Sequence, residues 1–267
     1  MNKPHHRMEE KTGLMYVGLD VHKKTCYGTV MTHDSKVLKR GQSPNDVESL
    51  EEFMEGLKET SVAMEAGYCW QPLYDWLEEA GHDIRLAHPK EVKTKAKKKT
   101  DKVDSEALAH LLRADLLPES YVPPRETRVI RDLVRRLSFL VGIRTMLKNR
   151  VHSELAKRGM SLGEPLFSRE GRGLLQGLGL EAVDQLFPVI EVLDRQVNVV
   201  SGCLRQVYRE DPRARLLTTI PGVGYYTALL IVSEIGDVNR LPDSERLCSY
   251  AGLMPSVWRI GGTTHHG

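Results

Sequence analysis

Few cysteines, no long apolar run and no common nucleotide-binding signature are found in this sequence. Its four cysteines are scattered and never form a CxxC pair, which argues against a disulfide framework and a thiolate zinc site. No apolar run reaches the roughly 18 residues that a membrane helix needs. Residues 1–11 are polar rather than an apolar signal, so we expect a cytosolic protein without a membrane partner. No Walker loop, dinucleotide fingerprint or HExxH helix occurs.

What is present in the first half is an alternation of short apolar segments with amphipathic ones. Strands in a meander are predicted over residues 15–22, 26–32 and 36–40. A helix (46–58), a strand (62–66), a helix (71–80), a strand (83–87) and a helix (104–117) are predicted to follow. This βββαβαβα order is that of the α/β ribonuclease H-like fold. We expect such a domain over residues 14–120, after a tail over residues 1–13.

The second half has mainly helical spacing. Three prolines within residues 118–124 predict a linker. Apolar residues then recur every three or four positions from Ile130 to Leu155 and again over 183–208, on either side of the glycine-rich stretch 159–179. We therefore predict a helical hairpin over residues 121–210 and a mainly helical domain over 211–267. The turn-rich end, which has no clear final element, indicates that this last domain is incomplete.

Four carboxylates are the candidate catalytic and metal-binding residues. Asp20 and Glu65 end two apolar strands that are neighbours in a ribonuclease H-like sheet, and a buried acid is costly unless it is paired or binds metal. Asp101 and Asp104 are spaced to point from one face at the start of a helix. Converging carboxylates suit two-metal phosphodiester chemistry with Mg²⁺ or Mn²⁺. Taken singly, each has a plainer explanation as a turn, salt-bridge or helix-capping residue.

Positive charge is concentrated in two segments although the net charge is only +2. Residues 90–102 contain seven lysines against two acids, and residues 125–158 contain ten basic residues against three acids. Such patches flanking an acidic site favour a polyanionic partner, although a solvated helix face would have the same composition. The candidate nucleic-acid-binding side chains are Lys23, Lys93, Lys95, Lys97, Lys98, Lys99, Arg135, Arg136, Arg144 and Lys148.

A glycine motif lies between two apolar helical stretches of the C-terminal region. Residues 220–228 resemble a helix-hairpin-helix turn, in which Gly222 and Gly224 would let backbone N–H groups approach a phosphate. A tight turn between packed helices explains the same residues equally well.

With these motifs identified, the chain resembles the insertion-sequence-110 family of DEDD transposases. The motifs that carry the resemblance are GLDVHK at 18–23, MEAG at 64–67, KTDKVD at 99–104, IPGVG at 220–224 and SYAGLMP at 249–255. The resemblance covers nearly the whole chain after the first dozen residues. It implies a RuvC-like N-terminal domain, a helical middle region and a C-terminal transposase domain that acts on double-stranded DNA at insertion-sequence ends.

The resemblance also implies partners and a second catalytic group. Members use the four acids with a divalent metal, a nucleophilic serine in the C-terminal domain, and a structured noncoding RNA that selects the DNA. They assemble as homo-oligomers in the prokaryotic cytosol, associated with the nucleoid. The serine lies in a Gly-Ser element beyond residues 261–267, so no serine of this sequence is assigned to that role and we expect a truncated chain.

Two other functions remain open at this point. A Holliday-junction resolvase would use the same carboxylates but would attack with water and leave free ends. A non-catalytic scaffold would bind RNA and DNA through the basic segments alone. Metal-dependent cleavage and a covalent adduct distinguish the three.

Overall fold

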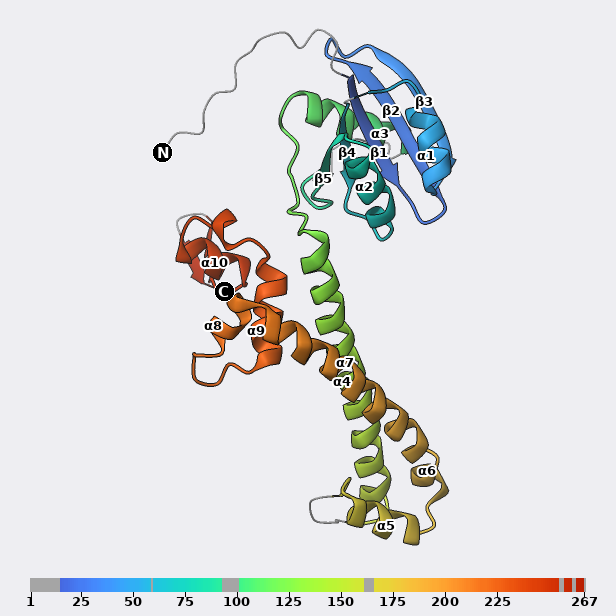
Figure 1. Cartoon of the computed structure of the whole chain (residues 1–267), viewed down its shortest axis with the longest axis vertical. Helices are drawn as coiled ribbons and strands as arrows, with labels where there is room; N and C mark the ends of the chain where they lie inside the picture. Colours follow the sequence, from blue (N-terminus) through green and yellow to red (C-terminus); the bar gives the residue numbers. More distant parts are fainter. Residues whose placement is uncertain are drawn as a thin grey trace. The chain divides into compact units, whose positions relative to one another are not determined.

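The computed structural model describes residues 15–58, 60–92, 101–160, 166–254, 257–260 and 263–266 (Figure 1). It divides into two compact units, one ending at Val122 and the other beginning at Pro123. Each unit is described by itself. Among the described residues, no helix has both the length and the apolar character needed to cross a bilayer.

The first unit is built on a mixed five-stranded sheet. Its strands are β1 (Met15–Val21), β2 (Thr25–Thr32), β3 (Val37–Pro44), β4 (Ser61–Glu65) and β5 (Asp83–Ala87). The order across the sheet is β3-β2-β1-β4-β5. The first three strands pair antiparallel, and β4 lies parallel to both β1 and β5. A mixed sheet followed by mostly helical segments is what the sequence predicted, consistent with a ribonuclease H-like domain.

Helices cover both faces of this sheet. The first core combines Val17 and Leu19 of β1 with residues of α1 (Val47–Met54) and α2 (Trp70–Glu79). The second combines Tyr16 of β1 with Leu108 of α3 (Asp101–Arg113). Side chains alternate between the two faces along a strand, so the even-numbered residues of β1 face α3.

The ends of three elements differ from the predicted ones. The third strand continues to Pro44 because it stays paired with β2 as far as Thr25. Helix α1 ends at Met54, shortly before Gly56, which has a φ of 79°. Helix α3 begins at Asp101 rather than at residue 104 and ends at Arg113, before a left-handed Asp115 with a φ of 55°. Such positive φ values end a helix.

In the second unit, two long helices pack against each other. They are α4 (Arg125–Ala156) and α7 (Phe187–Glu210), and Figure 1 shows them crossing, with α5 (Arg169–Gly177) and α6 (Glu181–Asp184) at the turn. Val134 of α4 shares a core with Leu204 of α7, and Val151 shares another with Ile190. The stretch 159–179 was expected only to interrupt helical spacing, yet it contains α5. That helix begins where the Ser168 hydroxyl accepts a hydrogen bond from the Gly171 N–H at 3.1 Å.

The C-terminal segments are short helices followed by a small hairpin. They are α8 (Pro212–Leu217), α9 (Tyr225–Ile235), η1 (Val238–Arg240), α10 (Ser244–Tyr250), β6 (Val257–Ile260) and β7 (Thr263–His266). Helices α8 and α9 share the core of α4 and α7 through Ala214 and Leu229. The prediction of no clear element near the end was wrong. The Asp243 carboxylate caps α10 by accepting from the Arg246 N–H at 2.7 Å, and β6 pairs antiparallel with β7.

Candidate metal centre

Asp20 is a buried carboxylate near the end of β1. It is only 5% exposed and, as an even-numbered residue, lies on the side of the sheet that α3 covers. Its Oδ2 atom is 3.2 Å from the Nε2 atom of His22. That approach lacks hydrogen-bond geometry, so the buried oxygen has no hydrogen-bond donor among the described residues. Leaving a charged oxygen in this state is costly, and a bound cation would offset that cost.

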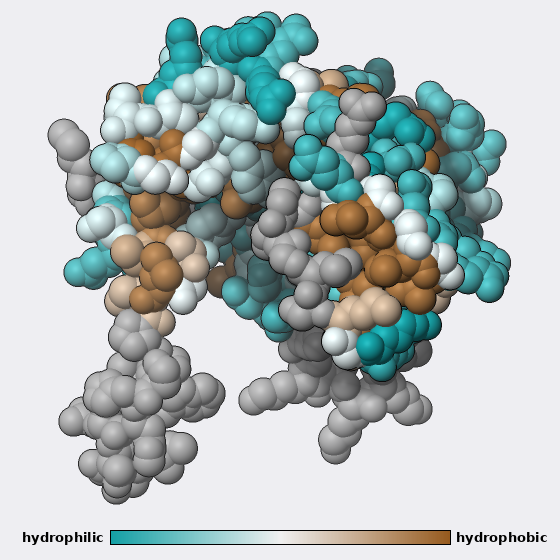
Figure 2. Space-filling model, turned by 90° about the horizontal axis from the view of Figure 1, so that it is seen from below, coloured by the Kyte–Doolittle hydropathy of each residue, from teal (hydrophilic) through white to brown (hydrophobic). Residues whose placement is uncertain are grey.

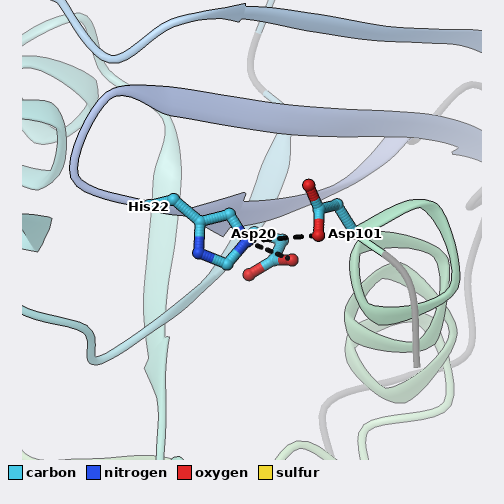
Figure 3. Close-up of side chains that lie close together, drawn as sticks. All are labelled: Asp20, His22 and Asp101. Carbon is cyan, nitrogen blue, oxygen red and sulfur yellow. Dashed lines mark ion pairs between the residues drawn. The ribbon is translucent and has the colours of Figure 1, made fainter.

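The first residue of α3 joins this carboxylate through the same imidazole. Oδ1 of Asp101 lies 3.4 Å from Nε2 of His22. Ligand atoms from Asp20, His22 and Asp101 all lie within 4.8 Å of one another, and Figure 3 shows one imidazole nitrogen of His22 paired with both carboxylates. The His22 side chain is 51% exposed, so the cluster is open to solvent on this side.

Strand register places Glu65 beside Asp20. Strands β1 and β4 are parallel and pair up to Leu19 and Met64, so Asp20 and Glu65 are the next residue of each strand. Ala63, two residues before Glu65, packs in the core beneath α3. Because side chains repeat every second residue, Glu65 belongs to the same face as Asp20.

A close helix–strand contact brings the acidic start of α3 to that face. A Cβ atom built on Gly18 would lie 2.0 Å from the Ser105 carbonyl oxygen, so only glycine permits this approach. The Ser105 hydroxyl also bonds the Thr29 hydroxyl at 2.8 Å in the interior. Asp104 and Asp101, in the first turn of α3, are thereby held close enough to Asp20 to affect its charge.

The electrostatic environment of Asp20 includes the other three acids. Burial raises the pKa of Asp20 most, the His22 imidazole lowers it, and repulsion from Asp104, Asp101 and Glu65 raises it further. A raised pKa means that the folded chain disfavours the charged form of Asp20. Carboxylate oxygens are the ligands that Mg²⁺ and Mn²⁺ prefer, and a bound cation would offset both burial and repulsion. The residues present therefore fit a divalent metal.

His22 is a residue that sequence reasoning did not assign as a metal ligand. The GLDVHK motif does not by itself single out the imidazole as a ligand, whereas the structure places its ring against two predicted ligands. Its position two residues after Asp20 was the available signal, because β1 ends between them and the turn folds the ring back. Imidazole nitrogen is a common metal ligand when neutral.

The predicted nucleic-acid-binding residues fall into different situations. Lys93, Lys95, Lys97, Lys98 and Lys99 lie outside the described residues. Lys23 is exposed in the turn after β1, and Arg136 is exposed on α4.

The other predicted cations of α4 already have partners within the fold. Arg135 donates two hydrogen bonds to the Glu234 carboxylate, at 3.0 and 3.1 Å. Arg144 bonds Asp194 at 3.1 Å, and Lys148 lies 4.9 Å from the centre of the Phe167 ring. These bonds neutralise much of the positive charge of Arg135 and Arg144. Both side chains should therefore attract a phosphate less strongly than an unpaired arginine does.

A basic cluster near the end of α4 was not singled out from the sequence. The Glu154 carboxylate is buried and accepts ion pairs from Arg150 at 2.9 Å, Lys157 at 3.0 Å and Arg158 at 3.1 Å. Hydrogen bonds from Lys157 and Arg158 lower the pKa of Glu154. Three cations against one anion leave a fixed surplus of positive charge on a surface suited to phosphates.

The glycine motif forms a tight turn between α8 and α9. Gly222 has a φ of 87°, a conformation that favours glycine, and the Val223 N–H bonds the Ile220 carbonyl at 3.1 Å. Gly224 occupies the N-cap position of α9 without any side-chain cap. Free N–H groups at a helix start attract anions. This geometry agrees with both interpretations of the motif.

Comparison with known proteins identifies related sequences over both units. Residues 17–158 match the DEDD transposase family of the IS110 type, and residues 214–267 match the family described as transposase IS116/IS110/IS902. A probable family 20 transposase of Pseudomonas aeruginosa is 28% identical, over 93% of this chain and 76% of its own length. The transposase for insertion sequence element IS1533 of Leptospira borgpetersenii is 25% identical, over 92% of this chain and 76% of its own. A pilin gene-inverting protein of Moraxella bovis is 24% identical, over 94% and 75%.

Proposed function

Since the chain belongs to the IS110 family of transposases and is thus a DNA transposase, we propose that Asp20, Glu65, Asp101 and Asp104 hold the metal with which it cuts and rejoins insertion-sequence ends. The observation that carries this proposal is the buried Oδ2 of Asp20. This oxygen has no hydrogen-bond donor among the described residues, and burial, followed by repulsion from three more carboxylates, raises the pKa of Asp20.

Each residue has a distinct task in this mechanism. A bound Mg²⁺ or Mn²⁺ ion would polarise the scissile phosphate and stabilise the charge that develops on it. Asp20 and Glu65 provide oxygens from the rigid ends of two paired strands. Asp101 and Asp104 provide oxygens from α3, whose position depends on the contact at Gly18. His22 would add its Nε2 nitrogen as a ligand at the solvent side.

We further propose that the attacking group is a serine of a Gly-Ser element C-terminal to Gly267. The first two relatives are longer than this chain, which spans 76% of each. A serine attack on the phosphodiester breaks its bond to the leaving 3′ or 5′ oxygen and leaves DNA covalently joined to protein. The bond energy is kept for rejoining, which suits a transposase better than hydrolysis by water does.

The proposed partners follow from charge and from the family. Double-stranded DNA and a structured noncoding RNA would contact the exposed Lys23 and Arg136 and the cations around Glu154. The turn at Gly222 and Gly224 would add backbone N–H donors. Figure 2 shows brown apolar patches at the surface among hydrophilic residues, and such patches are typical of protein contacts. We propose a homo-oligomer acting on the nucleoid in the cytosol.

The decisive experiment compares the 267-residue chain with its reading frame extended downstream. Labelled insertion-sequence ends are incubated with guide RNA and Mg²⁺ and then resolved on a denaturing protein gel. We expect a protease-sensitive DNA adduct from the extended chain, none from its Asp20→Asn or Glu65→Gln variants, and a normal yield from the control Asp34→Asn, an exposed turn residue.

Two other outcomes would favour the resolvase and the scaffold instead. Metal-dependent cleavage with free ends and no adduct would make the protein a resolvase-like nuclease. Nucleic-acid binding that is unchanged in Asp20→Asn plus Glu65→Gln, without cleavage by any form, would make it a scaffold.

A further inference from the structure

Tyr68 is the most exposed large apolar or aromatic side chain in the described part of the chain. Its exposure is 94%, whereas that of the next, Leu253, is 74%. It follows β4 by three residues, so it lies near the proposed metal ligand Glu65 in the sequence. A fully open aromatic ring has both of its faces available for contact with a binding partner.

The backbone on the N-terminal side of Tyr68 is fixed against the end of the sheet. The Ala66 N–H donates to the Ala87 carbonyl at 3.1 Å, and the Gly67 N–H to the Glu65 carbonyl at 2.8 Å. A Cβ atom built on Gly67 would lie 3.3 Å from the Val21 carbonyl oxygen. Gly67 therefore touches the end of β1 at Val21, which lies between Asp20 and His22 in the sequence, and Tyr68 is the next residue along the chain.

The chain on the other side is also anchored, and the neighbouring aromatic residue behaves differently. Trp70, the first residue of α2, packs against the core, and its ring meets Tyr74 edge-on with centroids 5.3 Å apart. Trp70 is thus packed against the core, whereas Tyr68 remains exposed to solvent. A ring held on a short anchored segment loses little freedom on binding, which favours recognition.

We propose that Tyr68 stacks on an unpaired nucleobase beside the phosphate that the metal centre holds. This inference rests on the proposed function, because it takes the four carboxylates to mark the scissile phosphate. Every base has a π-face, so an aromatic platform binds unstacked bases without reading their identity. That tolerance suits a site that must process DNA of varying sequence. An acidic centre repels phosphates, so stacking at its rim also supplies attraction that the carboxylates cannot.

The test uses the full chain with DNA that contains the fluorescent base 2-aminopurine, unpaired in a gapped duplex or paired in a continuous one. Stacking on an aromatic ring quenches this base. We expect wild type and Tyr68→Phe to quench the unpaired base equally. Tyr68→Ala should lose the quenching and bind the gapped duplex about 5- to 100-fold more weakly, with unchanged affinity for continuous duplex. Leu38→Ala, which removes another exposed side chain of the first unit, should match wild type.

Two results would overturn the inference. One is quenching and affinity that are the same in Tyr68→Ala as in wild type. The other is a changed oligomeric state of Tyr68→Ala by size-exclusion chromatography, with quenching retained, since the ring would then contact protein. Metal-dependent cleavage is measured on the same DNA with the extended reading frame that carries the proposed serine. Quenching that is indifferent to Tyr68, with cleavage intact, refutes the stacking alone, whereas Tyr68-dependent quenching without any cleavage refutes the proposed function alone.

Discussion

Gly18 of β1 and Ser105 of α3 are in such close contact that a Cβ atom on Gly18 would lie 2.0 Å from the Ser105 carbonyl oxygen and 2.7 Å from the Ala109 nitrogen. Both atoms belong to the backbone and cannot rotate away as a side chain can. The contact therefore sets the distance between the sheet, which holds Asp20, and the helix that begins at Asp101.

Replacing Gly18 with alanine should push α3 off the sheet. We expect Gly18→Ala to lower the free energy of unfolding by about 3 kcal/mol, the upper end of the usual cost of overpacking. Metal affinity should fall as well, because Asp101 and Asp104 move with the helix. Urea unfolding and calorimetric Mg²⁺ titration measure the two effects.

The matched control is Gly142→Ala, in the interior of α4, where no atom lies within 4 Å of the added Cβ. That variant should be more stable than wild type by about 1 kcal/mol, because alanine favours helix. If both variants behaved alike, the close packing at Gly18 would be without consequence.

Neutralising Asp20 should stabilise the metal-free protein. Burial raises the pKa of Asp20 in the folded protein above its ordinary value of 3.8. The free energy of unfolding therefore decreases as pH rises from 3.8 through the raised pKa. At pH 7 in EDTA, Asp20→Asn should therefore melt above wild type. Mg²⁺ at a hundredfold excess over Kd should stabilise wild type by about 2.7 kcal/mol and the variant far less. Scanning fluorimetry checks both, and equal stabilisation of the two proteins by Mg²⁺ would remove Asp20 from the site.

Arg144 should matter more for stability than for DNA binding. It pairs with Asp194 of α7, which also accepts from Arg172 at 3.0 Å, and these side chains are about a quarter exposed. Arg144→Gln leaves a half-buried carboxylate short of one donor, so we expect a loss of about 2 kcal/mol in urea unfolding. Arg136→Gln, at an exposed position, should keep its stability and weaken DNA binding. If Arg144→Gln instead kept its stability and weakened DNA binding, Arg144 would be a DNA contact.

The Glu154 cluster should give the hairpin a pH-dependent stability. Because hydrogen bonds from Lys157 and Arg158 lower the pKa of Glu154, its charged form stabilises the fold above the ordinary value of 4.5. That stabilisation is lost as pH falls through the lowered pKa. The difference in melting temperature between wild type and Glu154→Gln should be constant near neutrality and shrink below about pH 4. A difference that grows on acidification would contradict the assignment.

The cations of this cluster should contribute to salt-dependent nucleic-acid binding. Each phosphate contact releases condensed counterions, so affinity falls steeply as salt rises. We expect Arg150→Gln and Lys157→Gln each to reduce the slope of log affinity against log salt by about 1, equally for different DNA sequences. Fluorescence anisotropy between low and moderate salt measures the slope. A slope that neither variant changes would place the nucleic acid elsewhere.

Much of the first unit was predictable because its signals are local. Strand alternation located β1 and β4 and put Asp20 and Glu65 at their ends, and the spacing of Asp101 and Asp104 put both on one helix face. Boundaries were less predictable. Helix α3 begins three residues before the predicted start, and α5 forms within a glycine-rich stretch that local propensity disfavours.

The sequence by itself determined which acidic residues stand near strand ends and on one helix face, since strand and helix periodicity depends on near neighbours. Only the tertiary structure decided which of them meet. Thr29 and Ser105 bond across 76 positions of the chain, and the same packing sets Asp101 beside His22 and Asp20. It also committed Arg135 and Arg144 to Glu234 and Asp194 and left Tyr68 in solvent. Such contacts depend on how whole helices and strands pack. A local sequence pattern therefore does not predict which charged side chains form ion pairs.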